Sequence, residues 1–309
     1  MARFFITGGA GFIGSHTIDA LLQGGVSVTV FDKLPWALAE NLHHHKEKLT
    51  YIEGDIRDFE TLLTSMHGHT HVLHLAAIVS VPESIRDPRT AHDVNVTGAF
   101  NVFEAAREVG VKRVVYASSA AVYGDTATPP ISDDAELHPQ SPYGLHKVMN
   151  EQYAQLMSEI YGMSIMGLRY FNVYGTRQDP NSPYSGVLSI FMKKILANEP
   201  LTIYGDGSQT RDFISVTDIA RANVLALNAH VGGVCNVGTG TETSLNDLLD
   251  MLDTILGKKC ARNYVSSREG DILRSCASTE CAVTLLNFAS EKTFSDGITE
   301  LVNVYVRNA

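Results

Sequence analysis

The stretch Thr7-Gly8-Gly9-Ala10-Gly11-Phe12-Ile13-Gly14 directly follows the short apolar segment Arg3-Phe4-Phe5-Ile6 and opens a helical pattern that runs to Gln23. A strand, a glycine-rich turn and a helix in this order are typical of a dinucleotide-binding unit. The glycines let the backbone approach a pyrophosphate, whose charge is met by the amides and the positive dipole of the helix N-terminus. The stretch therefore predicts a cofactor site, with contacts expected from Gly8, Gly11, Phe12, Ile13 and Gly14.

The second predicted strand, at residues 26–31, ends at Asp32. A carboxylate at this point of a dinucleotide-binding unit can bind the hydroxyls of an adenosine ribose, and it would repel the 2′-phosphate of NADP. NAD is therefore the expected cofactor. Lys33 stands next to the carboxylate and keeps NADP open as the alternative.

Further strands are predicted at residues 49–52, 71–77 and 113–117, and helical patterns alternate with them. Strands that alternate with helices imply a parallel sheet. The predicted fold class is α/β, a doubly wound Rossmann-type parallel sheet with a smaller α/β substrate-binding domain. The small residues Ala76 and Ala77 end one of these strands, where open α/β sheets bind their ligands.

Two interleaved domains are predicted. We place the dinucleotide-binding domain at residues 1–171 and the substrate domain at residues 172–309. A loop with two prolines at 176–183 follows the boundary, and helices are then expected at 187–197, 216–229, 244–256 and 298–306. Residues 234–238 read as a strand, and we expect the segment 212–238 to rejoin the first sheet.

The segment Ser141-Pro142-Tyr143-Gly144-Leu145-His146-Lys147 places a phenol and an ammonium four residues apart. On a helix these two side chains share a face. A neighbouring cation favours the phenolate and lowers the pKa of a tyrosine, so such a pair can take and return protons. Ser119 lies just after the strand predicted at 113–117, and a hydroxyl at that edge of a sheet is well placed to bind substrate.

Composition limits the classes of protein that this chain can belong to. The 309 residues are 44% apolar and carry a formal net charge of −10, which disfavours general binding to nucleic acid or anionic membranes. No apolar run approaches the ~18 residues of a membrane span. The N-terminal segment also reaches its glycine turn too early for a signal peptide. We therefore expect a globular protein of the cytoplasm.

Cysteines and histidines do not predict a metal site. No two of the four cysteines, at positions 235, 260, 276 and 281, are spaced as Cys-x-x-Cys. The histidines gather at 43–45 and at 67–74, but no carboxylate or cysteine completes a known ligand pattern there. We expect reduced thiols and no metal ion.

Together these motifs resemble the extended short-chain dehydrogenase/reductases that act on nucleotide sugars, and most closely the UDP-galactose 4-epimerase group. The resemblance runs nearly end to end. It rests on the glycine turn 7–17, Asp55, His74-Leu75-Ala76-Ala77, Asn95, Ser118-Ser119, Ser141-Pro142-Tyr143-Gly144 with Lys147, and Arg169-Tyr170-Phe171-Asn172-Val173-Tyr174-Gly175.

The resemblance implies roles for individual residues. Tyr143 would be the acid/base, Lys147 would hold the phenolate and the nicotinamide ribose, and Ser119 would bind the reacting sugar hydroxyl. Further cofactor contacts are implied for Asp55, Ile56, Leu75, Ala76, Ala77, Asn95, Tyr170 and Val173. Substrate contacts are implied for Asn172, Arg211, Arg268, Asp271 and Ser275.

A departure from the wider family at Ala120 and Ala121 narrows the implied reaction. Sugar 4,6-dehydratases carry Thr-Asp-Glu where Ser119-Ala120-Ala121 stands here, and two alanines offer no acid or base for chemistry at C5 or C6. The resemblance therefore implies a reaction limited to oxidation and reduction at C4 of the sugar. The implied activity is C4 epimerisation of a UDP-sugar through a 4-keto intermediate with tightly bound NAD, in a homodimer. The alternatives are an NAD(P)-dependent keto-sugar reductase or dehydrogenase and a non-catalytic NAD-binding protein.

The residue at position 275 is related to which sugars such an enzyme accepts. In the family, epimerases limited to glucose and galactose tend to carry a tyrosine there, and those that accept N-acetylhexosamines a small residue. Ser275 therefore implies that acetylated UDP-hexosamines are accepted beside the plain hexoses. Arg274 could instead serve a sugar carboxylate, which keeps a UDP-uronic acid 4-epimerase as an alternative.

Overall fold

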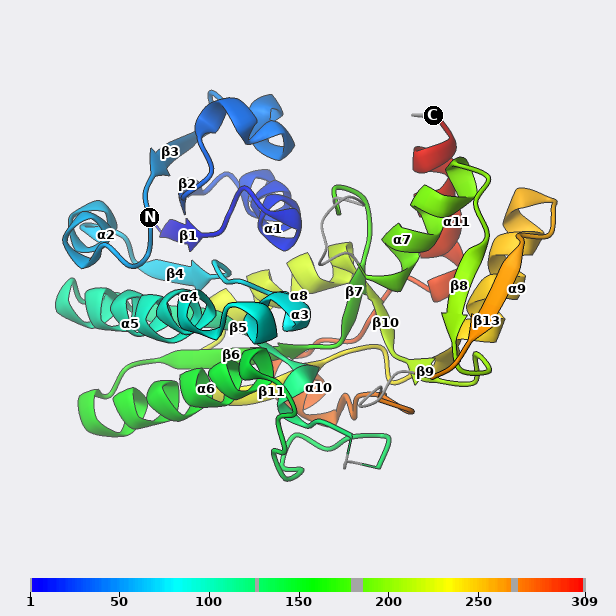
Figure 1. Ribbon diagram of the computed structural model, residues 1–309. Helices are drawn as coiled ribbons and strands as arrows, with labels where there is room; N and C mark the ends of the chain where they lie inside the picture. Colours follow the sequence, from blue (N-terminus) through cyan, green and yellow to red (C-terminus); the bar gives the residue numbers. More distant parts are fainter. Residues whose placement is uncertain (1, 126–127, 179–185, 268–271, 308–309) are drawn as a thin grey trace.

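The computed structural model describes residues 2–125, 128–178, 186–267 and 272–307 (Figure 1). Its centre is a seven-stranded sheet in which all neighbouring strands are parallel. The strand order is β11 (Gly233–Val237), β6 (Ile165–Tyr170), β5 (Arg113–Ser119), β4 (His71–His74), β1 (Arg3–Thr7), β2 (Ser27–Asp32) and β3 (Leu49–Glu53). The predicted doubly wound parallel sheet is confirmed.

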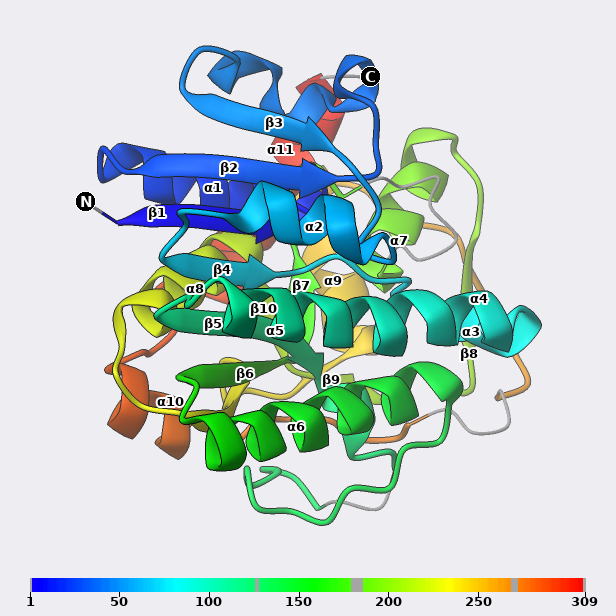
Figure 2. The ribbon, with the colours of Figure 1, turned by 90° about the vertical axis from the view of Figure 1, so that its left-hand side faces the viewer.

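Helices cover both faces of this sheet, as Figure 2 shows. One face carries α1 (Phe12–Gln23), α8 (Val216–Asn228) and α10 (Glu280–Leu286), and the other carries α2 (Phe59–Met66), α5 (Ala99–Glu108) and α6 (Pro142–Tyr161). Successive strand side chains point to opposite faces. Phe4 and Ile6 of β1 therefore join the core under α1 and α8, whereas Phe5 joins the core under α2 and α5.

The chain reverses its direction across the sheet between β1 and β4. From β1 it adds β2 and β3 on one side, and then returns to place β4 on the other side. Open α/β sheets bind ligands at such a switch point, outside the carboxyl ends of the strands. The topology therefore fixes where a cofactor can lie.

A second lobe lies beyond the carboxyl ends of the strands (Figure 1). It contains a parallel pair of strands and three helices around a separate apolar core: α7 (Val187–Leu196), β8 (Leu201–Tyr204), α9 (Leu245–Leu256), β13 (Arg262–Val265) and α11 (Phe294–Arg307). Two short strand pairs stand between the lobes, β7 (Asn172–Tyr174) with β10 (Phe213–Ser215), and β9 (Thr210–Arg211) with β12 (Thr243–Ser244). The domain boundary at 171/172 stays a prediction.

The sequence pattern around Asn95 indicates one long helix that runs to about Val109, and the structure divides this region into four helical segments. Short helices α3 (Val81–Arg86) and α4 (Pro88–His92) come first, a π-helical turn follows at Asp93–Gly98, and α5 continues from Ala99. Three short 3-10 segments complete the elements, η1 (Trp36–Leu38), η2 (Glu40–His45) and η4 (Ala120–Val122). Among the described residues, no helix combines the length and apolarity that crossing a membrane requires.

Candidate active site

One cavity of about 690 Å³ opens at the carboxyl ends of β1, β2, β4, β5 and β6 and reaches the second lobe. This volume lies within the range of ligand pockets. Its lining includes the predicted residues Gly8, Gly11, Phe12, Ile13, Gly14, Asp32, Asp55, Ile56, Leu75, Ala76, Ala77, Ser119, Tyr143, Lys147, Tyr170, Asn172, Val173, Arg211 and Ser275. The structure therefore brings together the residues predicted for cofactor and for substrate. Arg268 and Asp271 lie outside the described residues.

The glycine turn fits a pyrophosphate. Gly8 has φ +71°, and a Cβ added there would lie 2.6 Å from the backbone nitrogen of Ala76. A Cβ at Gly14 would lie 2.6 Å from the Gly8 carbonyl oxygen, so β1 and α1 meet too closely for larger residues. None of the described side chains caps the start of α1 at Gly11. The free backbone amides at the N-terminus of α1, and the positive end of the helix dipole, can therefore bind a phosphate group in the cavity.

Asp32 is held at the end of β2 by two backbone amides. Its Oδ2 accepts from the amide of Ala10 at 3.0 Å, and its Oδ1 accepts from the amide of Leu34 at 3.0 Å. Burial raises the pKa of the carboxyl, and these hydrogen bonds counteract that rise. The oriented carboxylate lines the cavity and keeps lone pairs for ribose hydroxyls.

Tyr143 is positioned by the start of α6. The Oγ of Ser141 caps this helix by accepting from the amide of Gly144 at 3.1 Å, and Pro142 occupies the first turn. A Cβ at position 144 would lie 2.6 Å from the carbonyl oxygen of Ala121, so only glycine permits this approach of α6 to the end of β5. The amide of Tyr143 also donates to Ser84 Oγ at 3.2 Å. These contacts bring Tyr143 close to Ser119.

Lys147 lies one turn further along α6 and is buried. Its ammonium donates to the carbonyl oxygen of Ala117 at 2.7 Å and lies 5.6 Å from the centre of the Tyr143 ring. Burial lowers the pKa of Lys147 to about 8, and the nearby Glu151 carboxylate acts in the opposite direction. Lys147 is therefore still mainly charged at neutral pH.

The pKa of Tyr143 differs from the sequence-based expectation. Burial raises it, and a hydrogen bond with Ser119 lowers it in part. On balance the pKa of Tyr143 is raised, which is opposite to the expected direction, because burial has the larger effect. The expectation that Lys147 lowers this pKa is therefore wrong for the protein alone.

Glu151 lies behind the cavity lining, where it contacts Ser118, and the sequence motifs did not reveal it. It stands four residues after Lys147, so Tyr143, Lys147 and Glu151 share one face of α6. Its carboxylate forms a buried two-point ion pair with Arg169 of β6, with distances of 2.9 and 2.7 Å, and accepts from Ser118 Oγ. The spacing of four residues between Tyr143 and Lys147, extended by four more, leads to Glu151, so the sequence did contain a signal for this residue.

Asn95 does not line the cavity, in contrast to its predicted contact with the cofactor. It is buried in the π-helical turn, and its side-chain amide forms two 2.8 Å hydrogen bonds with the backbone of Ile78. Asn150 of α6 donates to the carbonyl oxygen of Asn95 at 2.9 Å. Since Ile78 itself lines the cavity, Asn95 acts on the site by fixing the loop after β4 against α6.

On the substrate side, Ser275 and Arg274 differ in their surroundings. Ser275 is buried and lines the cavity. Arg274 does not line it, because its guanidinium is paired with the carboxylate of Glu242, which also accepts from Thr210 Oγ1. Arg211 lines the cavity while its guanidinium donates to the Ile272 carbonyl oxygen at 2.7 Å.

Comparison with known proteins shows the family of this chain. The model of the NAD dependent epimerase/dehydratase family matches residues 4–238. A putative UDP-glucose 4-epimerase of Methanocaldococcus jannaschii is 38% identical over 300 residues, which cover 96% of each chain.

Solved structures extend the comparison. The UDP-N-acetylglucosamine 4-epimerase from Methanobrevibacter ruminantium, in complex with UDP-N-acetylmuramic acid, has a TM-score of 0.95 at 36% identity and covers 100% of this chain and 99% of its own. The UDP-glucose 4-epimerase of Thermus thermophilus, in complex with NAD, has a TM-score of 0.91 at 34% identity, with coverage of 99% and 100%. The resemblance inferred from the motifs is confirmed, and this chain belongs to the NAD-dependent epimerase/dehydratase family.

Proposed function

We propose that the protein interconverts UDP-sugars that differ in configuration at C4, with NAD held throughout the cycle. The observation that carries this proposal is the shared cavity, in which Tyr143 and Lys147 stand between the glycine turn and the second lobe. Ala120 and Ala121 also line the cavity and supply no further acid or base. With Tyr143 as the proton-transfer group beside these alanines, the cavity is suited to oxidation and reduction at a single carbinol carbon.

The chain's own residues would move and hold a single proton. The Tyr143 oxygen accepts the proton of the C4 hydroxyl as that carbon is oxidised, and it returns the proton when the 4-keto sugar is reduced from its other face. NAD⁺ would supply the hydride acceptor and donor when bound. Ser119 would bind the reacting oxygen, and the Lys147 charge would stabilise the phenolate.

The sugar that fits best is a neutral one. The alternative of a uronic acid substrate depended on Arg274 to bind the sugar carboxylate, and that guanidinium is instead paired with Glu242 outside the cavity lining. The small Ser275 leaves room where an acetamido group can pass. We therefore propose UDP-glucose and UDP-galactose as substrates, together with their N-acetylated counterparts.

Purified protein is expected to equilibrate UDP-glucose and UDP-galactose without added NAD, because hydride is taken up and returned within one site. NMR of the sugar products would show the C4 epimer and no dehydrated 4-keto-6-deoxy sugar. A requirement for stoichiometric NAD(P)H would identify a keto-sugar reductase instead. Absence of any turnover with retained NAD would favour the non-catalytic alternative.

Ser275→Tyr is expected to shift the ratio of acetylated to plain substrate turnover about 10-fold towards the plain hexoses. This corresponds to ~1.4 kcal/mol of differential transition-state binding, because a phenol in the cavity would overlap an acetamido group. The kcat/KM values for UDP-N-acetylglucosamine and UDP-glucose measure the ratio. Ser275→Ala is the control and should leave it unchanged; an unchanged ratio in the tyrosine variant contradicts the assignment.

We also propose a homodimer that forms through α5 and α6, which lie side by side (Figure 2). Their outer faces expose the apolar residues Phe100, Leu145, Tyr153, Leu156 and Ile160. Contiguous exposed apolar residues are typical of interaction surfaces. The described thiols form no disulfide, which fits the cytoplasm that we propose as the compartment.

Leu156→Glu is expected to convert the dimer to a monomer, because it places a charge in the apolar contact. Light scattering coupled to gel filtration measures the mass. Ile190→Glu is the matched control, since Ile190 is also exposed but lies on α7 of the other lobe. Equal masses for the two variants would rule out the α5/α6 interface.

A further inference from the structure

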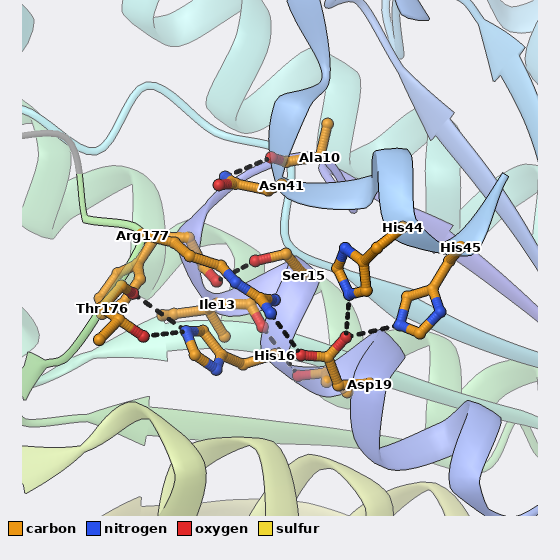
Figure 3. A network of polar contacts seen from close by, with 12 residues as sticks. Ala10, Ile13, Ser15, His16, Asp19, Asn41, His44, His45, Thr176 and Arg177 are labelled. Carbon is orange, nitrogen blue, oxygen red and sulfur yellow. Dashed lines mark hydrogen bonds and ion pairs between the residues drawn. The ribbon is translucent and has the colours of Figure 1, made fainter. Parts of the chain in front are cut away.

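Two consecutive histidines converge on one carboxylate at the rear of the cofactor helix. His44 and His45 end η2, and Asp19 lies on the outer side of α1, as Figure 3 shows. The His44 Nε2 lies 3.1 Å from Asp19 Oδ1, and the His45 Nε2 lies 2.7 Å from the same oxygen. No metal is expected from the sequence, because no carboxylate completes a ligand pattern beside these histidines. In the folded protein that carboxylate comes from Asp19, which lies 25 residues before His44 in the chain.

The spacing of these atoms matches a tetrahedral metal site. Ligand atoms at Zn–N and Zn–O distances of ~2.0–2.1 Å stand about 3.3 Å apart along a tetrahedron's edges. The His44 contact of 3.1 Å is close to that spacing, the His45 contact of 2.7 Å is about 0.6 Å shorter than it, and all three ligand atoms lie within 4.8 Å of one another. Small side-chain movements would therefore admit an ion.

Asp19 is held in place by a second contact, and His45 is held by burial. Arg177 binds the other oxygen of Asp19, with 2.8 Å between its Nη2 and Oδ2, so Oδ1 stays directed at the histidines. The side chain of His45 is only 13% exposed, and its Nδ1 is buried without a partner among the described residues. The two imidazole rings lie with their centres 4.0 Å apart. Ligating carboxylates in metal sites are typically fixed by such outer contacts.

We propose that Asp19, His44 and His45 form a site for a transition-metal ion of the Zn²⁺ class, with water in the fourth position. Two imidazole nitrogens and one carboxylate oxygen suit Zn²⁺, whereas Mg²⁺ and Ca²⁺ prefer oxygen ligands alone. On binding, each ring carries its proton on Nδ1 and offers the Nε2 lone pair. The Arg177 charge opposes a divalent ion, which lowers the affinity of the site.

Occupancy would tie η2 to α1, the helix whose N-terminus lines the cofactor cavity. Arg177 also precedes Gln178, which lines the same cavity. An ion that binds only the folded protein stabilises it. Zinc should therefore raise the midpoint of thermal unfolding without contacting the active site.

The test is titration of the chelator-treated full-length protein with Zn²⁺, with Mg²⁺ as the comparison ion, followed by calorimetry and thermal unfolding. We expect one equivalent of Zn²⁺ per chain, a raised unfolding midpoint and no effect of Mg²⁺ at equal concentration. His44→Ala and His45→Ala should each weaken Zn²⁺ binding at least ~10-fold. His44 is about half exposed, so its variant is expected to fold.

His43→Ala is the matched control, because His43 belongs to the same 3-10 segment but its Nε2 contacts the Trp36 carbonyl oxygen at 2.9 Å. Its Zn²⁺ affinity should equal that of the parent. Equal affinity in the parent and in the His44 and His45 variants would overturn the site. So would the absence of Zn²⁺ binding to the parent, which would leave the contacts as a hydrogen-bond network only.

Discussion

Tyr143→Phe is expected to lower turnover at least ~10²-fold while NAD stays bound, since a positioned acid/base contributes about that much to a rate. Phenylalanine keeps the ring that packs in the cavity and removes only the oxygen that exchanges a proton. We propose that the glycine turn and Asp32, which also line the cavity, hold the cofactor, so its content should not change. Turnover of UDP-galactose and the NAD released on denaturation are the two measurements.

Tyr161→Phe provides the control for this variant. Tyr161 ends the same helix, is 55% exposed and does not line the cavity. Near-normal turnover in both variants would remove Tyr143 from the mechanism. Loss of NAD from the Tyr143 variant would instead assign the residue to cofactor binding.

Local patterns predicted the elements that the site depends on. The helix expected to start at the glycine turn and end at Gln23 is observed as Phe12–Gln23, and the predicted strand at 49–52 is observed as Leu49–Glu53. These elements are specified by alternating apolar residues and by glycine, which act over a few residues. The expected strand at 71–77 ends earlier, at His74, because Ala76 and Ala77 belong to the cavity lining rather than to the sheet.

Pairings between distant residues could not be predicted in the same way. Asp19 and His45 are 26 residues apart, and they meet only because η2 folds back on α1. In the π-helical turn at Asp93–Gly98, Asn95 forms two hydrogen bonds with Ile78, which lies 17 residues earlier in the chain, and no local propensity encodes this pairing. Such contacts follow from the tertiary fold. A single sequence contains both residues of each contact but does not indicate that they meet.

The ion pair of Glu151 and Arg169 is the buried contact with the largest expected effect on stability. Both side chains are 7% exposed. Glu151→Gln leaves the guanidinium buried without its counter-charge, and breaking such a pair from one side costs about 3–5 kcal/mol. Denaturant unfolding measures the loss. Glu159→Gln makes the same chemical change at an exposed site on α6 and should stay within ~0.5 kcal/mol of the parent.

The same substitution is expected to change the pH dependence of turnover. Lys147 has a pKa of about 8, lowered by burial and supported by the Glu151 carboxylate. Without that carboxylate the charged ammonium is less favoured, so the pKa falls further and a smaller fraction of Lys147 is charged at pH 8. The alkaline limb of kcat should therefore move to lower pH in Glu151→Gln and stay in place in Glu159→Gln. If Glu151→Gln loses stability while its alkaline limb remains unchanged, Glu151 supports the fold alone and not the charge on Lys147.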